Sequence, residues 1–264
     1  MTKNWCSAIT DARPNHLMVR GYPLEELIGR ISFADAVFLV LIGELPDARQ
    51  RRLMDALLVC AIDHGPTPPT TRSARSVAAS RPPLVSSVAA GILAISDFHG
   101  GAIERAMGTM LAVQHACEAG KNLEEAARIE VRSRRSAGER LAGYGHRVHT
   151  SDPRAQRLLE LLRETNPPSR FADVGEAIRG ALEAELGREL PINVDGAMAA
   201  VLCELGFPPE LANGFFAMSR LPGLLAHVHE ETARERPMRD IDFSAVAYDG
   251  PPERHLPETW GEGD

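Results

Sequence analysis

SFADAVFLVLIG, residues 32–43, carries the start signal and the stop signal of a helix, together with the apolar run between them. Ser32 can accept a hydrogen bond from a free backbone amide, and Asp35, three residues later, stands in the capping-box position. Gly43 and Pro46 then end the helix. The apolar residues recur at helical spacing without strict alternation, so this stretch predicts a helix and not a strand.

The same helical spacing extends over most of the chain. We expect further helices over four ranges: residues 47–62, residues 83–117 with a break near residues 97–101, residues 194–205, and residues 210–234. Strict alternation is nearly absent, and prolines predict loops at residues 66–69 and from residue 251 onward. The predicted fold class is therefore all-α. Residues 1–264 are expected to form a single domain, which can comprise a large and a small helical subdomain.

Composition excludes several classes of partner. The formal net charge is -7 and the basic residues are scattered, which argues against nucleic acid or an anionic membrane as partner. The longest apolar runs, such as residues 36–42, are too short to span a bilayer. The cysteines lie far apart, without a CxxC pair and with no signal peptide ahead of them. We therefore expect a protein with ordinary thiols in a reducing cytoplasm.

Four short segments place ionisable side chains beside glycine or proline. They are DHGP at residues 63–66, HGGA at 99–102, GYGHRV at 143–148 and PINVDG at 191–196. Backbone groups at turns and helix ends are free to bind a ligand. Each segment also has a structural explanation, because a loop histidine is often only hydrogen-bonded and an acid in a first helical turn is favoured by the helix dipole.

Metal binding is less attractive. No histidine and carboxylate pairs stand at the spacings of familiar zinc helices. His227 and His229 lie two residues apart, which in a helix directs them to different faces. We therefore expect no metal site, and we interpret these two histidines as solvent-facing or core residues.

The four segments, in this order, resemble the citrate synthase family. The resemblance covers nearly the whole chain and includes further motifs: RGYPLEEL at residues 20–27, GELP at 43–46, DPR at 152–154, SR at 219–220 and RP at 236–237. Any one of these pieces could occur by chance, whereas the ordered set is highly specific. It implies a citrate synthase-like helical fold.

Two departures favour the short, citryl-CoA lyase-like form of that family. Full-length citrate synthases carry a long helical segment between the GELP and DHE motifs, whereas here only residues 47–62 separate the two positions. Gly65 and Pro66 follow His64, as in the citryl-CoA lyase module at the C-terminal end of ATP-citrate lyase. The SDFHGGA, LPINVDG and RPMRDIDF segments also look more like that module and its free-standing relatives.

The resemblance implies a role for each motif residue. It implies that Asp195 is the base, that His99 donates to the thioester oxygen, and that His146 donates to the keto oxygen. The residues implied to bind the dicarboxylate are His64, Arg154, Arg220 and Arg236. No P-loop or GxGxxG motif is present, so coenzyme A phosphates would be held by scattered basic residues, with Arg147 as the one candidate.

The implied activity makes or breaks the carbon-carbon bond between acetyl-CoA, or a short acyl-CoA, and oxaloacetate or a related 2-oxo acid. The coenzyme A thioester is a substrate, and no permanently bound cofactor is expected. One alternative is a true citrate or 2-methylcitrate synthase; the other is a non-catalytic protein that binds coenzyme A or a tricarboxylate. The missing segment and Gly65 favour the lyase, and the presence of His99, His146 and Asp195 argues against the binding protein.

The resemblance also implies a shared active site. In this family the arginine of the C-terminal RP motif reaches into the neighbouring subunit, and Arg236 holds that position here. We therefore expect a homodimer, or a higher even oligomer. The partners are otherwise small molecules, with neither nucleic acid nor a membrane among them.

Overall fold

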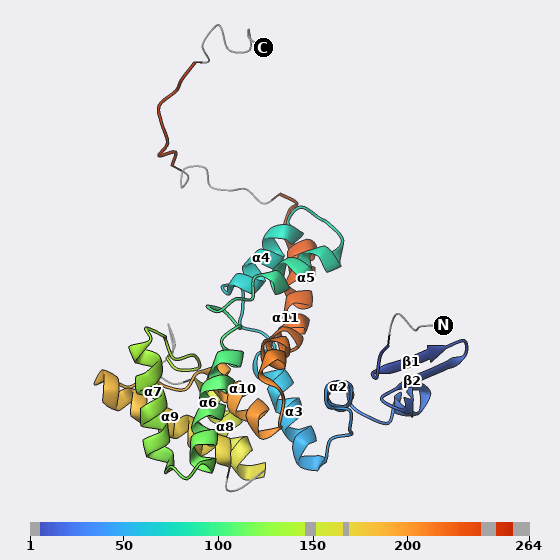
Figure 1. Ribbon diagram of the computed structural model, residues 1–264. Coiled ribbons are helices and arrows are strands. Elements are labelled where there is room, and N and C mark those ends of the chain that lie inside the picture. The colour runs from blue at the N-terminus through green and yellow to red at the C-terminus, as the bar shows by residue number, and fades with distance from the viewer. Residues whose placement is uncertain (1–5, 146–151, 166–168, 239–246, 256–264) are drawn as a thin grey trace, which may run out of the picture.

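The computed structural model describes residues 6–145, 152–165, 169–238 and 247–255. Helices dominate these ranges (Figure 1), which confirms the predicted helical fold. Helix α2, Phe33–Ile42, begins at Ser32 with the capping box formed by Ser32 and Asp35, and it ends at Gly43 in the left-handed conformation. Local sequence signals thus set both ends of this helix.

A small antiparallel sheet precedes the helices and was not predicted. Strands β1, Thr10–Arg13, β2, His16–Val19, and β3, Tyr22–Pro23, pair in the order β1-β2-β3 and lead into α1, Leu24–Leu27. Strands this short contain too few residues to display an alternating pattern. The Arg20 guanidinium attaches the sheet to α2 by donating two hydrogen bonds to the Val40 carbonyl oxygen, at 3.0 and 2.7 Å.

The main core surrounds α10, Val194–Glu204. Residues 196–203 are all buried, and α10 contacts α6, Ile103–Glu118, α8, Pro153–Thr165, and α9, Arg170–Leu186. A helix that is apolar all round belongs in the interior. Helix α7, Leu123–Ser136, packs against α6 and α9 on the outside of this group (Figure 1). The start of α10, which carries Asp195, is thereby held rigidly at the edge of the core.

A second, smaller core forms the other end of the molecule. Helices α4, Pro69–Ala78, and α5, Leu84–Leu93, pack against the second half of α11, Ala212–Arg234 (Figure 1). The first half of α11 follows a 3-10 turn at Pro209–Leu211 and belongs to the main core, so one helix links both cores. The expected break in residues 83–117 is the connection between α5 and α6.

The connection between α3 and α4 is short. Helix α3, Ala48–Cys60, is followed directly by residues 61–68 and then by α4, which agrees with the predicted lack of the long insert. Across the described residues, no helix combines the length and the apolar character needed to cross a membrane.

Candidate active site

The loop between α5 and α6 presents His99 in a tight turn. The His99 amide donates to the Ser96 carbonyl oxygen at 2.7 Å, and the Ser96 amide donates back to the His99 carbonyl oxygen at 2.9 Å. Gly100 has a φ of +72°, and a Cβ atom there would lie 2.3 Å from the Phe216 ring. The turn therefore requires glycine, and it brings the His99 ring edge-to-face onto Phe216 with the centroids 5.6 Å apart.

His99 is a neutral imidazole at physiological pH. Burial lowers the pKa of its ring to about 4, with smaller contributions from the positive Arg220 and from His64. Its Nε2 lies 3.0 Å from the hydroxyl oxygen of Thr70, which is buried on α4. When the hydroxyl donates to Nε2, the ring proton resides on Nδ1. A neutral ring so oriented can donate one hydrogen bond to a substrate oxygen.

Arg220 is a buried cation with an unused hydrogen-bonding edge. It lies within α11 at 1% exposure, its Nε donates to the Ala61 carbonyl oxygen at 2.8 Å, and its guanidinium stands 5.0 Å above the Phe216 ring. Its Nη1 is also buried but has no hydrogen-bond partner among the described residues. Burial lowers the pKa of this arginine. A buried cation with an unsatisfied donor is costly, which is typical of a group that awaits an anion.

The loop after α3, which carries His64, is fastened to α11 at several points. The Ser219 hydroxyl accepts from the Ala61 amide and donates to the Leu58 carbonyl oxygen. The Asp63 carboxylate lies 3.0 Å from His227 Nε2 and accepts from the Gly65 amide.

Burial acts to raise the pKa of Asp63, but the Gly65 and His64 amides and His227 outweigh burial and hold that pKa below its usual range. The side chain of His227 is 14% exposed and contacts Asp63. This histidine therefore helps to position the loop, a role that its spacing from His229 did not predict.

Asp195 lies in the first turn of α10. Asn193 caps this helix through the Gly196 amide, and its side-chain nitrogen donates to the Gly145 carbonyl oxygen at 2.8 Å. Burial raises the pKa of Asp195 to about 6; Arg154 lowers it, Asp152 raises it and Arg220 lowers it, in decreasing order of effect. A carboxyl group with a pKa near neutrality is suited to accept and return a proton.

The GYG segment is fitted closely against the start of α10. The Gly145 amide donates to the Pro191 carbonyl oxygen, and the Asn193 amide donates to the Gly143 carbonyl oxygen. A Cβ atom on Gly196 would lie 2.4 Å from that same oxygen, so only glycine allows this approach. The residue before His146 is thereby held beside the helix that carries Asp195.

Five of the predicted site residues form one neighbourhood. Arg154 and Arg220 both act on the pKa of Asp195, and Arg220 and His64 both act on that of His99. These five side chains come from the α3–α4 loop, the α5–α6 loop, α8, α10 and α11. Cys60, which sequence reasoning did not select, belongs to the same neighbourhood; burial raises the pKa of its thiol to about 12.

Of the other three predicted residues, only Arg236 lies within the described part of the chain, and it is not part of this cluster. His146 and Arg147 lie outside the described residues. Arg236 is exposed beyond the end of α11. At about 1.5 Å per residue, α11 alone extends roughly 21 Å from Arg220 to Arg234, which separates Arg236 from the site of its own chain.

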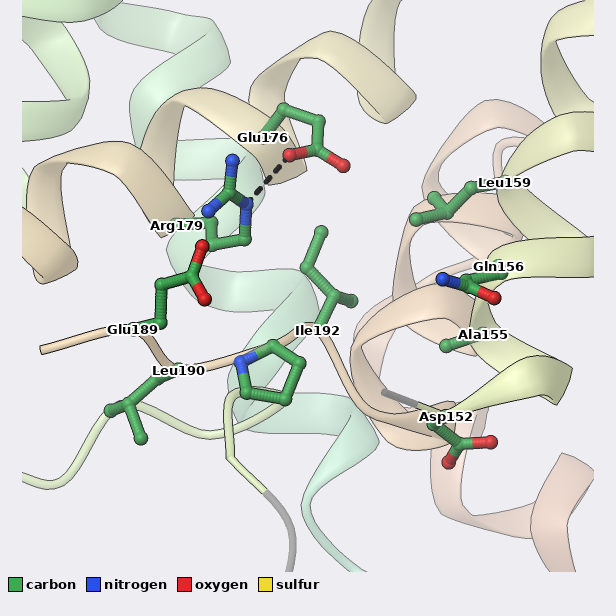
Figure 2. A pocket seen from close by; sticks show the side chains of 10 residues that line it. Asp152, Ala155, Gln156, Leu159, Glu176, Arg179, Glu189, Leu190 and Ile192 are labelled. Carbon is green, nitrogen blue, oxygen red and sulfur yellow. Dashed lines mark hydrogen bonds and ion pairs between the residues drawn. The ribbon is translucent and has the colours of Figure 1, made fainter. Parts of the chain in front are cut away.

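A cavity of about 210 Å³ is lined by residues of α8, of α9 and of the segment before α10. Figure 2 shows Glu176 and Arg179 paired on one side, with Asp152 on the other. Its described lining also includes Glu189 but neither His99 nor Asp195. Three carboxylates and one guanidinium among these lining residues disfavour a dicarboxylate there, so we do not assign the substrate to this cavity. Within the described parts of the chain, no group of three or more His, Cys, Asp or Glu residues could hold a metal ion.

Sequence reasoning missed Thr70 and gave no role to Asp152, although Asp152 stands two residues before Arg154. The Asp152 carboxylate accepts two hydrogen bonds from the Arg154 guanidinium, at 3.0 and 2.8 Å. The acid-x-arginine spacing is a signal that could have indicated this pair. Thr70 offers no such signal, because only folding brings it to His99.

Comparisons with known proteins agree with this fold. Citryl-CoA lyase from Hydrogenobacter thermophilus superimposes with a TM-score of 0.88 and 38% identity, covering 98% of this chain and 99% of that one. ATP citrate lyase from Methanothrix soehngenii, solved with citrate and coenzyme A, has a similar fold, with a TM-score of 0.79, 22% identity, and coverage of 96% of this chain and 43% of that one.

Among curated sequences, the citrate/2-methylcitrate synthase of Bacillus subtilis (strain 168) is 29% identical over 227 residues, which are 84% of this chain. The matched part is only 57% of that enzyme's length, so the chain spans little more than half of this relative. Residues 46–240 match the citrate synthase C-terminal domain. With a match that extends over most of its length, the chain belongs to the citrate synthase family.

Proposed function

We propose that the chain is a citryl-CoA lyase, which cleaves citryl-CoA into acetyl-CoA and oxaloacetate and can run the reverse condensation. One observation carries the proposal: a carboxyl group with a pKa of about 6, a neutral imidazole and a buried, incompletely paired guanidinium lie in one site. The likeness to a citryl-CoA lyase over nearly the full length of both chains supports it further.

Each group then has one task. His146 accepts the proton of the citryl hydroxyl group as the carbon-carbon bond breaks and the keto group of oxaloacetate forms. The electron pair of that bond moves into the thioester, whose enolate oxygen accepts a hydrogen bond from His99. Protonated Asp195 gives its proton to the enolate carbon and completes the methyl group of acetyl-CoA. No water is consumed and no electrons are exchanged, so the step balances without a cofactor.

The arginines orient the acid portion of the substrate. Arg220 offers its buried Nη1 to a carboxylate, and Arg154 offers a second guanidinium from the start of α8. A guanidinium group can donate two parallel hydrogen bonds to the two oxygens of one carboxylate. His64, exposed on the loop fastened to α11, contacts the 2-oxo acid in this proposal.

A true synthase is the second candidate, because the curated relatives are named citrate synthases. One assay separates the two activities. Citryl-CoA, and separately acetyl-CoA with oxaloacetate, are supplied while free thiol and oxaloacetate are followed. A lyase releases oxaloacetate from citryl-CoA without free thiol, whereas a synthase releases thiol in both reactions. Ligand-induced thermal stabilisation without any turnover would instead identify a binding protein.

Assembly as a homodimer belongs to the same proposal. Several apolar side chains of α5 and α11 are exposed, among them Val85 at 74%, Leu93 at 84% and Leu221 at 40%. A second copy packed on this face would bury them, as expected for a two-fold interface. Arg236, remote from its own site, would then serve the partner's site.

A cytoplasmic location is also part of the proposal. All four cysteines are free thiols in the structure, and Cys203 is buried. Unpaired thiols are usual where the surroundings are reducing.

A further inference from the structure

Asp152 is a buried carboxylate that accepts hydrogen bonds from four donor groups of the described chain. It is 1% exposed and immediately precedes α8. Its Oδ1 accepts from the backbone amide and the Nε of Arg154, at 3.1 and 3.0 Å. Its Oδ2 accepts from Arg154 Nη2 at 2.8 Å and from the Val194 amide at 3.2 Å. One side chain thus joins the start of α8 to the start of α10.

The pairing leaves a defined part of Arg154 for a ligand. A guanidinium group is planar and presents two forks of N–H groups. Asp152 occupies the fork formed by Nε and Nη2, which leaves the fork of Nη1 and Nη2 pointing away from it. Because the side chain is already oriented, a substrate carboxylate need not immobilise a freely rotating arginine.

The same carboxylate acts on Asp195. Val194, whose amide donates to Asp152, is the residue immediately before Asp195. Among the described residues, the other charged or titratable groups that interact with Asp195 are Arg154, Arg220 and Cys60. As a nearby like charge, Asp152 contributes to the raised pKa of Asp195, second to burial among the raising effects.

We propose that Asp152 is the positioning residue of this site, and that its one carboxylate orients Arg154 toward the substrate and fixes the position of Asp195 at the start of α10. The inference rests on the proposed function, in which Arg154 binds a carboxylate and Asp195 moves a proton. Asp152 itself touches no substrate. Its effect passes through the two groups that it holds.

The test uses Asp152→Asn, with Asp35→Asn as the matched control. Asparagine keeps the size of the side chain, but either placement of its amide nitrogen faces two hydrogen-bond donors. Asp35 is likewise buried at 2% exposure, caps α2 and pairs with Arg51 at 2.8 Å, outside the site. The two variants lose comparable carboxylate contacts in different places.

For Asp152→Asn we expect kcat for citryl-CoA cleavage to fall by about 10² and KM to rise by about tenfold, since a misplacement of about 1 Å can have effects of this size. In the dependence of the rate on pH, the limb that reflects the titration of Asp195 should move to lower pH by roughly half a unit or more. The reason is that the substitution removes a nearby negative charge. Asp35→Asn should leave kcat, KM and the pH profile unchanged. If Asp152 had only a structural role, Asp152→Asn would lower the stability of the protein without moving that limb.

A double-mutant cycle with Arg154→Gln separates the two effects of Asp152→Asn. In an Arg154→Gln background, the effect of Asp152→Asn on KM should disappear while the shift of the pH limb remains. The proposal would be overturned if Asp152→Asn kept kcat within threefold of wild type and left the Asp195 limb of the pH profile in place. It would also be overturned if Asp152→Asn raised KM by the same factor in the Arg154→Gln background as in wild type.

Failure of the proposed function would look different. A wild-type protein that turned over neither citryl-CoA nor acetyl-CoA with oxaloacetate would refute the lyase assignment. In that case the affinity for oxaloacetate, measured by calorimetry, tests Asp152 by itself. We expect about tenfold weaker binding for Asp152→Asn than for wild type and for Asp35→Asn. Equal or tighter binding would overturn the role of Asp152.

Discussion

Replacing Gly223 by alanine should damage the site through the loop that carries His64. Gly223 lies within α11, where an added Cβ atom would be 2.3 Å from the Ile62 carbonyl oxygen and 3.0 Å from Asp63 Oδ1. Ordinary van der Waals contact begins near 3.4 Å, so the carbonyl oxygen must withdraw by about 1.1 Å, the difference between 3.4 and 2.3 Å. Neither helix α11, which links both cores, nor this backbone can yield easily.

Displacing Ile62 affects two side chains of the site, because the residues that contact them stand immediately before and after Ile62 in the chain. Ala61, one residue earlier, accepts the 2.8 Å hydrogen bond from Arg220 Nε, and Asp63, one residue later, contacts His227. We expect Gly223→Ala to lower kcat/KM for citryl-CoA by about 10², in line with the effect of a 1 Å misplacement. The free energy of unfolding should fall by about 1 kcal/mol, because overpacking of roughly 1–3 kcal/mol outweighs a helix-propensity gain of about 0.5–1 kcal/mol.

Gly214 supplies the control in the same helix. It is exposed, and no atom of the described chain lies within 4 Å of a Cβ atom added there. Gly214→Ala should therefore raise the free energy of unfolding by up to about 1 kcal/mol and leave kcat/KM unchanged. Urea unfolding and citryl-CoA cleavage, measured on both variants, provide the comparison. If Gly223→Ala behaved like Gly214→Ala in both measurements, the close packing of α11 on the loop would not matter to the site.

Four further predictions concern the residues of the site. Asp195→Asn should lower kcat by about 10² to 10⁴ yet bind oxaloacetate normally; turnover within tenfold of wild type would contradict the assignment. In wild type, the raised pKa of Asp195 makes stability fall as pH rises from about 4 through 6, while the lowered pKa of His99 makes it rise over the same window. Thermal unfolding of Asp195→Asn should therefore show steeper stabilisation with rising pH, and unchanged curves would argue against these shifts. Thr70→Val keeps the size of the side chain but removes the 3.0 Å contact with His99 Nε2, so it should lower kcat by about tenfold with little change in KM. A change in KM alone would indicate a role in binding. Asp195→Asn and Arg236→Ala chains, refolded together in equal amounts, should recover about a quarter of wild-type activity per site, and no recovery despite subunit exchange would mean that Arg236 does not serve the partner.

Helices α2, α3, α5, α6, α10 and α11 could be predicted because their signals are local. Ser32, Asp35 and Gly43 mark the ends of α2 within a dozen residues, and paired glycines mark the break after α5. Hydrogen bonds between neighbours in the chain suffice to stop or start a helix, so no distant contact is needed. The short N-terminal sheet could not be predicted in this way, since strands of four residues or fewer depend on their pairing partners.

The same distinction between local signals and distant contacts applies to the residues of the site. The identities of His64, His99, Arg154, Asp195 and Arg220 came from ordered motifs, and the structure brings those five together. No sequence pattern indicated that Thr70 contacts His99 or that His227 contacts Asp63, because those partners are 29 and 164 residues apart. Contacts across such separations exist only once the helices have packed.

Charge states were likewise decided by tertiary structure. The sequence alone determined that an aspartate begins α10 and that an arginine lies within α11. Packing decided that the aspartate has a pKa of about 6 and that the arginine keeps a buried donor without a partner among the described residues. The reason is that the free energy of a charge depends on the water and the counter-charges around it. Residue type supplies the chemical group, and the three-dimensional surroundings determine its reactivity.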